Sequence, residues 1–300
     1  MGSERPVRSV LISDVDNTLF DWVRIWHAAF SAMLDELLRL SGLEENQLLP
    51  AIRAVHQHVG TSEYAFLIGD VPLLVKPAGE TPVLDFYAPA IDAFRAARKK
   101  ALSFYPGVGE TLAELRSRGV LIICYTESLA YYSQYRFRKL GLDRLVDHLY
   151  SPPDHDLPEG LSREDIRFHA ASHYALEHTD HRFTPLGEYK PNPGILRSIL
   201  RDLGVAPDQA VYIGDNPHKD VWMAQQAGIL DVYAAYGAVQ DSEAYALLRR
   251  VSHWPDHDVF EEKRRIEDGS ISPSLTLDRF DGLLDHICFT AFGRDNHGGG

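Results

Sequence analysis

The sequence predicts an α/β protein whose core is a doubly wound, Rossmann-like parallel sheet with an inserted helical cap domain. Strand-length apolar runs alternate with helical patterns, as in parallel sheets that helices cover on both faces. These runs are residues 8–13, 120–125, 210–213 and 230–234. Residues 22–103 interrupt the alternation with helical patterns and contain no good strand. Pairs of aspartates follow two of the apolar runs, where ligands bind in open α/β sheets.

The first strand, expected at residues 8–13, leads through an acidic loop into a series of helices. Apolar side chains at helical spacing predict a helix from about Trp22 to Leu40. Its apolar face holds Ile25, Ala29, Met33, Leu37 and Leu40. Further helices are expected at residues 45–59 and 83–102, with a helical stretch at 62–75 that breaks at Pro72. We assign residues 21–103 to a cap inserted into a core of residues 8–20 and 104–240.

The rest of the core alternates helix and strand. Helices are expected at residues 108–118, 128–140, 193–203 and 219–227, with a short strand near 147–151. Residues 152–187 are rich in proline, histidine and acidic side chains, and we interpret them as an insertion in the core with one helix near 163–177. Residues 241–300 form a C-terminal extension with helices near 241–251 and 277–287, and its last residues are expected to be disordered.

Composition limits the partners of the chain. Its 30 Lys and Arg residues against 43 Asp and Glu residues give a net charge of −13. An acidic protein is not expected to bind nucleic acid as a scaffold or to dock stably on anionic membranes. No apolar segment approaches the ~20 residues that span a bilayer. Two cysteines, Cys124 and Cys288, do not make a disulfide framework and favour a cytoplasmic location. The sequence leaves the oligomeric state open.

Two pairs of carboxylates follow expected strands. Asp14 and Asp16 come after the first strand, one residue apart, so that one can attack or bind metal while the other exchanges protons. Asp215 and Asp220 follow the apolar run at 210–213. Carboxylate oxygens beside a phosphate site suit Mg²⁺, which prefers hard ligands.

Two further positions suit the binding of an anion. Thr126 follows the apolar run at 120–125 and precedes a helix start, where a hydroxyl and free backbone amides form an anion site. Lys190 precedes another helix and supplies the positive charge that an acidic protein needs to handle phosphate. Glu127, next to Thr126, is a further candidate for contact with substrate.

In order and spacing, these residues resemble the four motifs of the haloacid dehalogenase superfamily of phosphohydrolases over roughly residues 8–238. The matches are Asp14-Val15-Asp16-Asn17-Thr18-Leu19, Thr126 after an apolar strand, Lys190 ahead of Pro191, and Gly214-Asp215 with Asp220. The helical insertion resembles the first type of cap in this family, and the cap type and motif layout are similar to those of phosphoglycolate-phosphatase-like members. Dehalogenase members lack the second aspartate of the first motif, so Asp16 favours phosphate-ester chemistry.

The resemblance implies a Mg²⁺-dependent phosphatase that hydrolyses a small phosphorylated metabolite through an aspartyl-phosphate. Asp14 would be the nucleophile, and Asp16 would protonate the leaving alcohol and later deprotonate the attacking water. Mg²⁺ would bind Asp14, the backbone carbonyl of Asp16, and Asp215.

Four further roles follow from the same resemblance. Thr126 and Lys190 would hold the phosphoryl oxygens as charge shifts in the transition state. Asn17 would contribute to phosphate binding. Asp220 would either support the metal through water or orient Lys190.

Two alternatives stay open at this point. A phosphomutase would return the phosphoryl group to a substrate oxygen rather than to water. A regulatory or protein-binding member would use residues 152–187 and the C-terminal extension as an interface.

A group of histidines in the insertion belongs to none of the four motifs. Its members are His155, His169, His173, His178 and His181. With Asp180 nearby, a zinc site is conceivable. A polar insertion on a solvated helix is the favoured interpretation.

Several cap residues are candidates for contact with substrate. They are Trp22, Arg24, Trp26, His56 and His58. For the two tryptophans, packing at the hinge between cap and core is the favoured interpretation.

Overall fold

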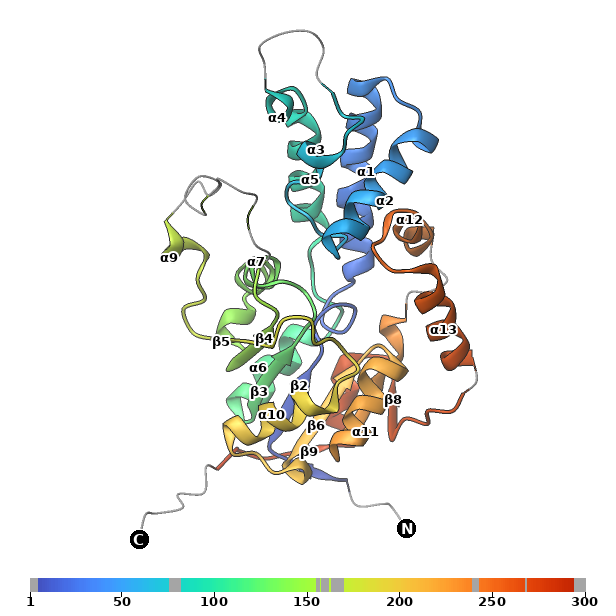
Figure 1. Cartoon of the computed structure of the whole chain (residues 1–300). Helices are drawn as coiled ribbons and strands as arrows, with labels where there is room; N and C mark the ends of the chain where they lie inside the picture. The colour runs from blue at the N-terminus through green and yellow to red at the C-terminus, as the bar shows by residue number, and fades with distance from the viewer. Residues whose placement is uncertain are drawn as a thin grey trace. The chain divides into compact units, whose positions relative to one another are not determined.

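The chain divides into two compact units (Figure 1). The computed structural model describes residues 5–75, 82–154, 157, 162, 170–238, 243–267 and 269–293. The sheet unit comprises Met1–Phe20, Ser103–Ala238 and Gly269–Gly300. The helical unit comprises Asp21–Leu102 and Val239–Asp268.

Seven parallel strands form the main sheet of the sheet unit, which confirms the predicted α/β fold class. In spatial order they are β5 (Asp180–Phe183), β4 (His148–Ser151), β3 (Leu121–Tyr125), β2 (Val10–Ser13), β6 (Ala210–Gly214), β7 (Leu230–Ala234) and β8 (Leu275–Leu277). The chain runs outward from β2 through β3 and β4 to β5, and then returns to the other side of β2 as β6. The strand order therefore reverses at β2 (Figure 1).

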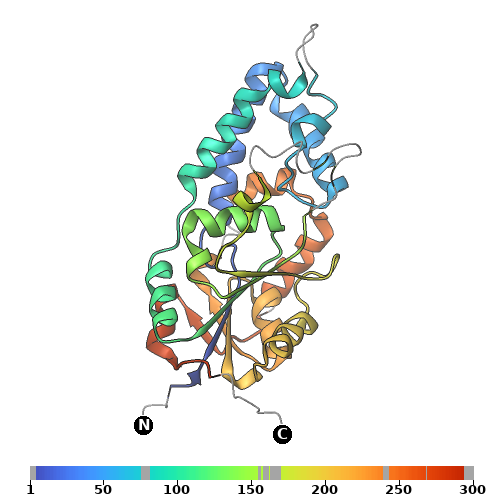
Figure 2. The same ribbon diagram turned by 90° about the vertical axis from the view of Figure 1, so that its left-hand side faces the viewer.

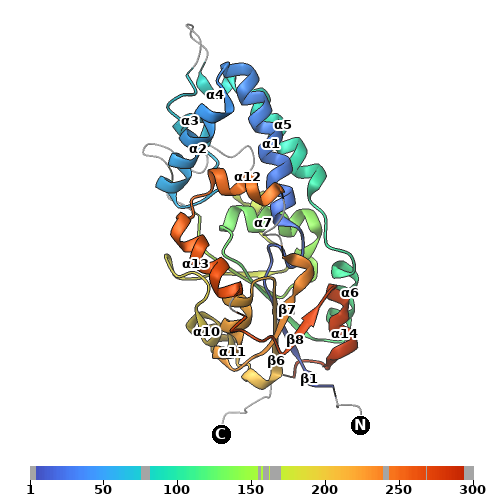
Figure 3. The same cartoon turned by 90° about the vertical axis from the view of Figure 1, so that its right-hand side faces the viewer.

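Helices cover both faces of this sheet. On one face, α10 (Pro193–Leu203) and α11 (Met223–Ala227) pack on Val10, Ile12 and Tyr212. On the other side lie α6 (Val108–Ser117) and α14 (Leu283–His286) (Figure 3). The central strand β2 is apolar except for its last residue, Ser13, and it is wholly buried because neither of its faces meets water.

The sheet unit contains further short elements. They are α7 (Ala130–Leu140), α9 (Ala171–Tyr174), the 3-10 turns Leu142–Arg144, Pro207–Gln209, Ala235–Gly237 and Phe280–Gly282, the π-helical turn η3 (Pro217–Trp222), and a two-stranded sheet of β1 (Val7–Arg8) and β9 (Cys288–Phe289).

The helical unit is organised around α1 and α5, which lie side by side (Figure 2). Its helices are α1 (Trp22–Ser41), α2 (Glu45–Val59), α3 (Leu67–Asp70), α4 (Val83–Phe86), α5 (Ala88–Ala101), α12 (Glu243–Val251) and α13 (Asp256–Glu267). Helix α12 comes from the C-terminal part of the chain and buries Leu248 and Val251 in the same core as Phe30 and Leu37. Among the described residues, no helix is both long and apolar enough to cross a membrane.

The structure corrects two expected elements. Residues 180–183 form the edge strand β5 within a segment interpreted as a polar insertion, and its sequence Asp-His-Arg-Phe has no apolar run because an edge strand faces solvent. Of the helix expected near 163–177, the described residues form α9 at Ala171–Tyr174 and no helix at 175–177, and residues 163–169 lie outside the described part of the chain. The helix expected near 277–287 is replaced by β8, a 3-10 turn and the single turn α14. The expected disorder of the last residues also lies outside the described part.

Asp143 ties the segment that precedes β5 to the rest of the sheet unit. Its carboxylate accepts hydrogen bonds from the backbone N–H groups of Glu177 (2.9 Å), His178 (3.1 Å) and Thr179 (2.9 Å). Burial alone would raise the pKa of Asp143, but these hydrogen bonds lower it below its usual value.

Asp143→Ala should therefore lower the free energy of unfolding by about 2–3 kcal/mol, because three backbone donors lose a charged acceptor. Urea unfolding measures this loss, with Asp208→Ala as a control at an exposed acid of the same unit. Equal free energies of unfolding for the two variants would show that the hydrogen bonds of Asp143 do not stabilise the fold.

Candidate active site

The carboxyl ends of β3, β2 and β6 bring the residues of the predicted site to one edge of the sheet. Ser13, the last residue of β2, pairs with Cys124 on one side and with Ile213 on the other. Asp14 therefore leaves its strand beside the ends of β3 and β6, which lead into Thr126 and Asp215. This is the point at which the strand order reverses, where open α/β sheets bind their ligands.

Lys190 lies at the centre of the site. Its ammonium Nζ is 2.5 Å from Oδ1 of Asp14 and 2.9 Å from Oδ1 of Asp220, and all three side chains are buried. The rings of Tyr125 and Tyr212 flank the ammonium, with centroids 4.9 and 5.6 Å from Nζ. Burial by itself would lower the pKa of Lys190, but the two aspartates outweigh it and raise the pKa above its ordinary value. The lysine is therefore held as a cation.

Asp220 orients this lysine from the π-helical turn η3. Its carboxylate also accepts hydrogen bonds from the Tyr212 hydroxyl (2.8 Å) and from the backbone N–H of Asn216 (3.1 Å). Gly214 makes this approach possible, because a Cβ atom there would lie 2.3 Å from Cγ of Asp220. The resemblance implies that Asp220 either supports the metal through water or orients Lys190. The contact present in the structure is the one with Lys190.

Two buried carboxylates, Asp14 and Asp220, and the half-buried carboxylate of Asp215 form a potential metal site. Ligand oxygens of Asp14, Asp215 and Asp220 all lie within 4.8 Å of one another, and in the described part of the chain this is the one such group of acid, histidine or cysteine side chains. Burial raises the pKa of Asp14 to about 7, with Lys190 acting in the opposite direction. Burial and the two neighbouring aspartates raise the pKa of Asp215 well above its usual value.

These carboxylates fit a magnesium ion. The donors are hard oxygens, and a divalent cation among them would relieve the repulsion and the desolvation that raise their pKa values. Asp14 and Asp215 would hold the ion, whereas Asp220 accepts hydrogen bonds from Lys190, Tyr212 and the backbone N–H of Asn216.

Asp16 contacts residues that follow the end of β3. Its Oδ2 accepts hydrogen bonds from the hydroxyls of Thr126 (3.0 Å) and Ser128 (2.7 Å), and its Oδ1 lies 3.2 Å from a guanidinium nitrogen of Arg136. Ser128 and Arg136 are absent from the predicted site. The signal for Arg136 was available, because it stands on the buried face of α7 between Tyr132 and Phe137, where an unpaired charge would be costly.

The loop that carries the first motif is held rigidly in place. The Thr18 hydroxyl donates a hydrogen bond to Oδ2 of Asp14 (3.0 Å), and the Tyr236 hydroxyl donates one to the Thr18 carbonyl (2.9 Å). Asn17 has a φ of 58°, in the left-handed region that asparagine tolerates. A Cβ at Gly237 would lie 2.0 Å from the Asn17 carbonyl oxygen, so glycine is required there.

Glu127 joins the loops that carry Thr126, Lys190 and Asp220. Its carboxylate accepts hydrogen bonds from the backbone N–H of Lys190 (2.9 Å) and from the ammonium of Lys219 (3.0 Å). It is therefore engaged within the protein, whereas the sequence suggested it only as a contact for substrate.

Two of the cap candidates are engaged in packing within the helical unit. Trp26 stacks on Phe30 with ring centroids 4.6 Å apart and donates a hydrogen bond to the Ser62 carbonyl (3.3 Å). His56 is buried, with Nδ1 2.7 Å from the Val251 carbonyl oxygen. Trp22 is half-buried, and Arg24 and His58 are exposed.

The described histidines of the insertion do not form a metal centre. His181 lies 2.8 Å from the Ser151 hydroxyl and 3.2 Å from the Gln134 amide, whereas His173 and His178 are exposed. Three ligand atoms do not come together here among the described residues, and His155 and His169 lie outside them. Asp180 is paired with Arg182 and His148.

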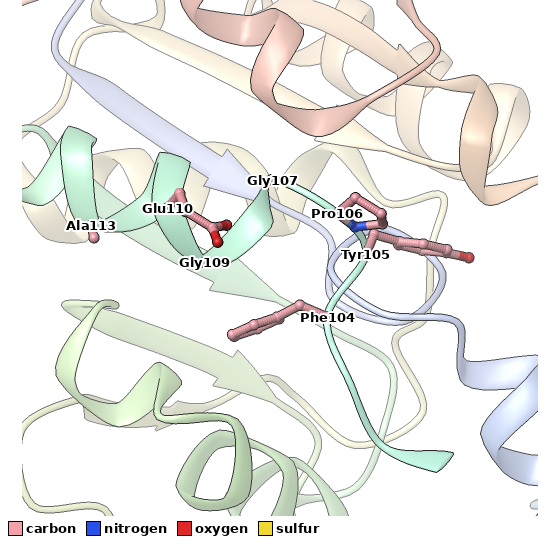
Figure 4. A pocket seen from close by; sticks show the side chains of 7 residues that line it. All are labelled: Phe104, Tyr105, Pro106, Gly107, Gly109, Glu110 and Ala113. Carbon is pink, nitrogen blue, oxygen red and sulfur yellow. The ribbon is translucent and has the colours of Figure 1, made fainter.

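A cavity of about 510 Å³ opens beside the start of α6 (Figure 4). It is lined by Phe104, Tyr105, Pro106, Gly107, Gly109, Glu110 and Ala113. None of these belongs to the acidic cluster or to the four motifs, so this cavity is separate from the chemistry described above.

Comparison with known families agrees with this geometry. Residues 9–228 match the model of a hydrolase family described as haloacid dehalogenase-like hydrolase. The matched range includes all four motifs and every site residue from Asp14 to Asp220.

Curated relatives are named as phosphatases. The chain is 28% identical to a glyceraldehyde 3-phosphate phosphatase of Methanopyrus kandleri over 79% of its length and 88% of the relative. It is 30% identical to a phosphoserine phosphatase of Thermus thermophilus over 80% of its length and 94% of the relative. A phosphoglycolate phosphatase of Nitrosococcus oceani is 28% identical, covering 76% of the chain and 84% of the relative.

Among solved structures, a 2-haloacid dehalogenase from Pseudomonas syringae superimposes with a TM-score of 0.53. The alignment covers 93% of this chain and 97% of the dehalogenase at 17% sequence identity. At this identity the similarity supports the fold and says nothing of the substrate.

Gly214→Ala should lower the free energy of unfolding by about 2–3 kcal/mol, because the added methyl group overlaps the buried Asp220 side chain. Thermal or urea unfolding measures the loss. Gly293→Ala is the matched control, since no atom lies within 4 Å of a Cβ at Gly293. Similar stabilities for the two variants would mean that Asp220 can move at no cost.

His181 should make stability depend on pH. Burial lowers the pKa of His181 in the folded protein from 6.5 to about 4. Between pH 6.5 and pH 4, His181 is therefore protonated in the unfolded chain but neutral in the folded one. The free energy of unfolding of the wild-type protein should therefore fall as the pH decreases from about 6.5 to 4. Urea unfolding across this range should show a smaller decrease for His181→Gln, while the exposed His257→Gln should behave as wild type. A decrease as large in His181→Gln as in wild type would contradict the assignment.

Proposed function

This chain belongs to the haloacid dehalogenase-like hydrolase family, and we propose that it is a Mg²⁺-dependent phosphatase of a small phosphorylated metabolite. The observation that carries the proposal is the buried contact of Lys190 with Asp14, beside Asp215, at the carboxyl edge of the sheet. The proposed nucleophile, a buried cation and the two proposed metal ligands all come from the sheet unit.

In the proposed first step, Asp14 attacks the phosphorus atom of the substrate. A bond forms between a carboxylate oxygen of Asp14 and phosphorus, and the bond from phosphorus to the leaving oxygen breaks. Asp16 donates the proton that the leaving alcohol needs. The Thr18 hydroxyl and Lys190 hold one carboxylate oxygen of Asp14 each, which fixes the direction of attack.

In the second step, water hydrolyses the aspartyl-phosphate. Asp16, now a carboxylate, takes a proton from the water while the water oxygen attacks phosphorus. The bond between phosphorus and the Asp14 oxygen breaks, which releases phosphate and restores the Asp14 carboxylate. Asp14 and Asp16 thus share the two roles that one carboxylate cannot perform at once.

Positive charge and hydrogen bonds stabilise the transferring phosphoryl group. Lys190 and the Thr126 hydroxyl are the proposed donors to its oxygens, with Asn17 at the adjacent loop. Lys190 is held in place by Asp220, so little reorganisation is needed during the reaction. Mg²⁺, bound by Asp14, Asp215 and the Asp16 carbonyl, would reduce the repulsion between the anionic nucleophile and the anionic substrate.

The names of the relatives suggest the first substrates to test. We propose a phosphate monoester of the size of glyceraldehyde 3-phosphate, phosphoserine or phosphoglycolate, the compounds that appear in those names. The helical unit is the proposed cap that selects the leaving group. The proposed location is the cytoplasm, in keeping with two free cysteines.

Asp14→Asn should abolish Mg²⁺-dependent hydrolysis of p-nitrophenyl phosphate, with kcat falling by about a thousandfold or more, because the amide cannot form the covalent intermediate. Release of p-nitrophenolate measures the rate, and Asp208→Asn is the control at an exposed acid. Substantial activity in Asp14→Asn would remove Asp14 from the reaction. With glyceraldehyde 3-phosphate, phosphoserine and phosphoglycolate as substrates, release of free phosphate without a phosphorylated isomer distinguishes a phosphatase from a phosphomutase.

A further inference from the structure

Arg136 is a buried cation that the four motifs do not account for. It lies on α7 with its side chain 4% exposed, and one guanidinium nitrogen is 3.2 Å from Asp16 Oδ1 and 2.8 Å from the Ser128 hydroxyl. We propose that Arg136 is a positioning residue that, together with Ser128, holds the Asp16 carboxylate in place for the second step, in which it takes a proton from water. This inference rests on the proposed function, because it assigns a partner to its acid and base.

The contacts of Asp16 support the inference. Oδ2 of Asp16 accepts hydrogen bonds from the hydroxyls of Thr126 and Ser128, and Oδ1 accepts one from Arg136. Both oxygens of the carboxylate are therefore hydrogen-bonded. Ser128 also accepts the hydrogen bond from Arg136, which closes a ring of Asp16, Ser128 and Arg136. A side chain bonded on both oxygens has little freedom to rotate.

Arg136 also contacts the first-motif loop at a second point. Its guanidinium carbon lies 5.7 Å from the ring centroid of Phe20 and 5.9 Å from that of Tyr132. Phe20 is connected to Asp16 through a backbone bridge and to Phe104 through another. The arginine thus packs on the end of the same loop whose acid it binds, which fixes the distance between α7 and that loop.

The held position of Asp16 suits its proposed role. The Thr126 hydroxyl donates its one hydrogen to Asp16 in the structure. It would turn to the phosphoryl group when substrate binds, which leaves Ser128 and Arg136 to hold Asp16. Each aspartate of the first motif has its own cation, because Lys190 contacts Asp14 and Arg136 contacts Asp16. One guanidinium nitrogen of Arg136 donates to both a carboxylate and a hydroxyl, and the same planar group lies over the Phe20 ring.

A double-mutant cycle tests whether Arg136 acts through Asp16. The variants are Arg136→Met, Asp16→Asn and the double variant, assayed for steady-state hydrolysis of p-nitrophenyl phosphate with saturating Mg²⁺. Arg136→Met should lower kcat by about 10- to 100-fold, and Asp16→Asn by about 100-fold or more. In the Asp16→Asn background, the arginine substitution should change kcat by no more than about twofold, since the residue it positions is gone.

A pre-steady-state measurement separates positioning from a loss of structure. p-Nitrophenolate leaves without a proton, so Arg136→Met should still release a rapid burst of it, equivalent to the enzyme present, before slow hydrolysis of the aspartyl-phosphate. Arg136→Lys should recover part of kcat. Lys139→Met, at an exposed position of the same helix, should behave as wild type.

Ser128→Ala tests the same inference if Arg136→Met does not fold. It removes one hydroxyl from the ring and should lower kcat by several-fold, about 3- to 10-fold, again only while Asp16 is present. Losses that multiply in the double variants, or a kcat of Arg136→Met within about twofold of wild type, would overturn the inference while leaving the proposed function intact. An inactive wild-type enzyme would overturn both.

Discussion

The structure depends most on the compensation of charge among buried carboxylates at the carboxyl edge of the sheet. Asp14, Asp215 and Asp220 lie within 4.8 Å of one another, and Lys190 contacts two of them. Isolated charges at such depth would be prohibitive, so each must have a partner. One lysine compensates only part of three carboxylates. A divalent cation is the natural complement for the remainder, and we propose Mg²⁺ in that role.

The fold brings these groups together through the reversal of strand order at β2. Parallel strands place the residues that follow them at one edge, and the central strand has neighbours on both sides. Close approach then requires two glycines, because side chains at Gly214 and Gly237 would overlap Asp220 and the Asn17 carbonyl. The arrangement of the site therefore depends on glycines at 214 and 237, which the pattern of strands and helices alone does not predict. Relatives named as phosphatases, at 28–30% identity over most of the chain, support the same chemistry.

Much of this arrangement could be predicted from the sequence, because strand ends are marked by apolar runs. Asp14, Thr126 and Asp215 each follow such a run, and parallel pairing was enough to expect them at one edge. The strand β5 could not be predicted, since an exposed edge strand has no apolar pattern. The packing of α12 in the helical unit could not be predicted either, because periodicity identifies an apolar face but not the helix that covers it. Arg136 stands on the buried face of α7, but a single arginine in a helix is most often a surface residue, so its contact with Asp16 does not follow from the sequence.

The most direct test of this account is to find the phosphoryl group on the enzyme. The protein would be mixed with p-nitrophenyl phosphate and Mg²⁺, quenched in acid during turnover, digested, and analysed by mass spectrometry. The account predicts a phosphoryl group on the peptide that contains Asp14, at that residue. Release of phosphate with no such adduct, or an adduct on another residue, would contradict it.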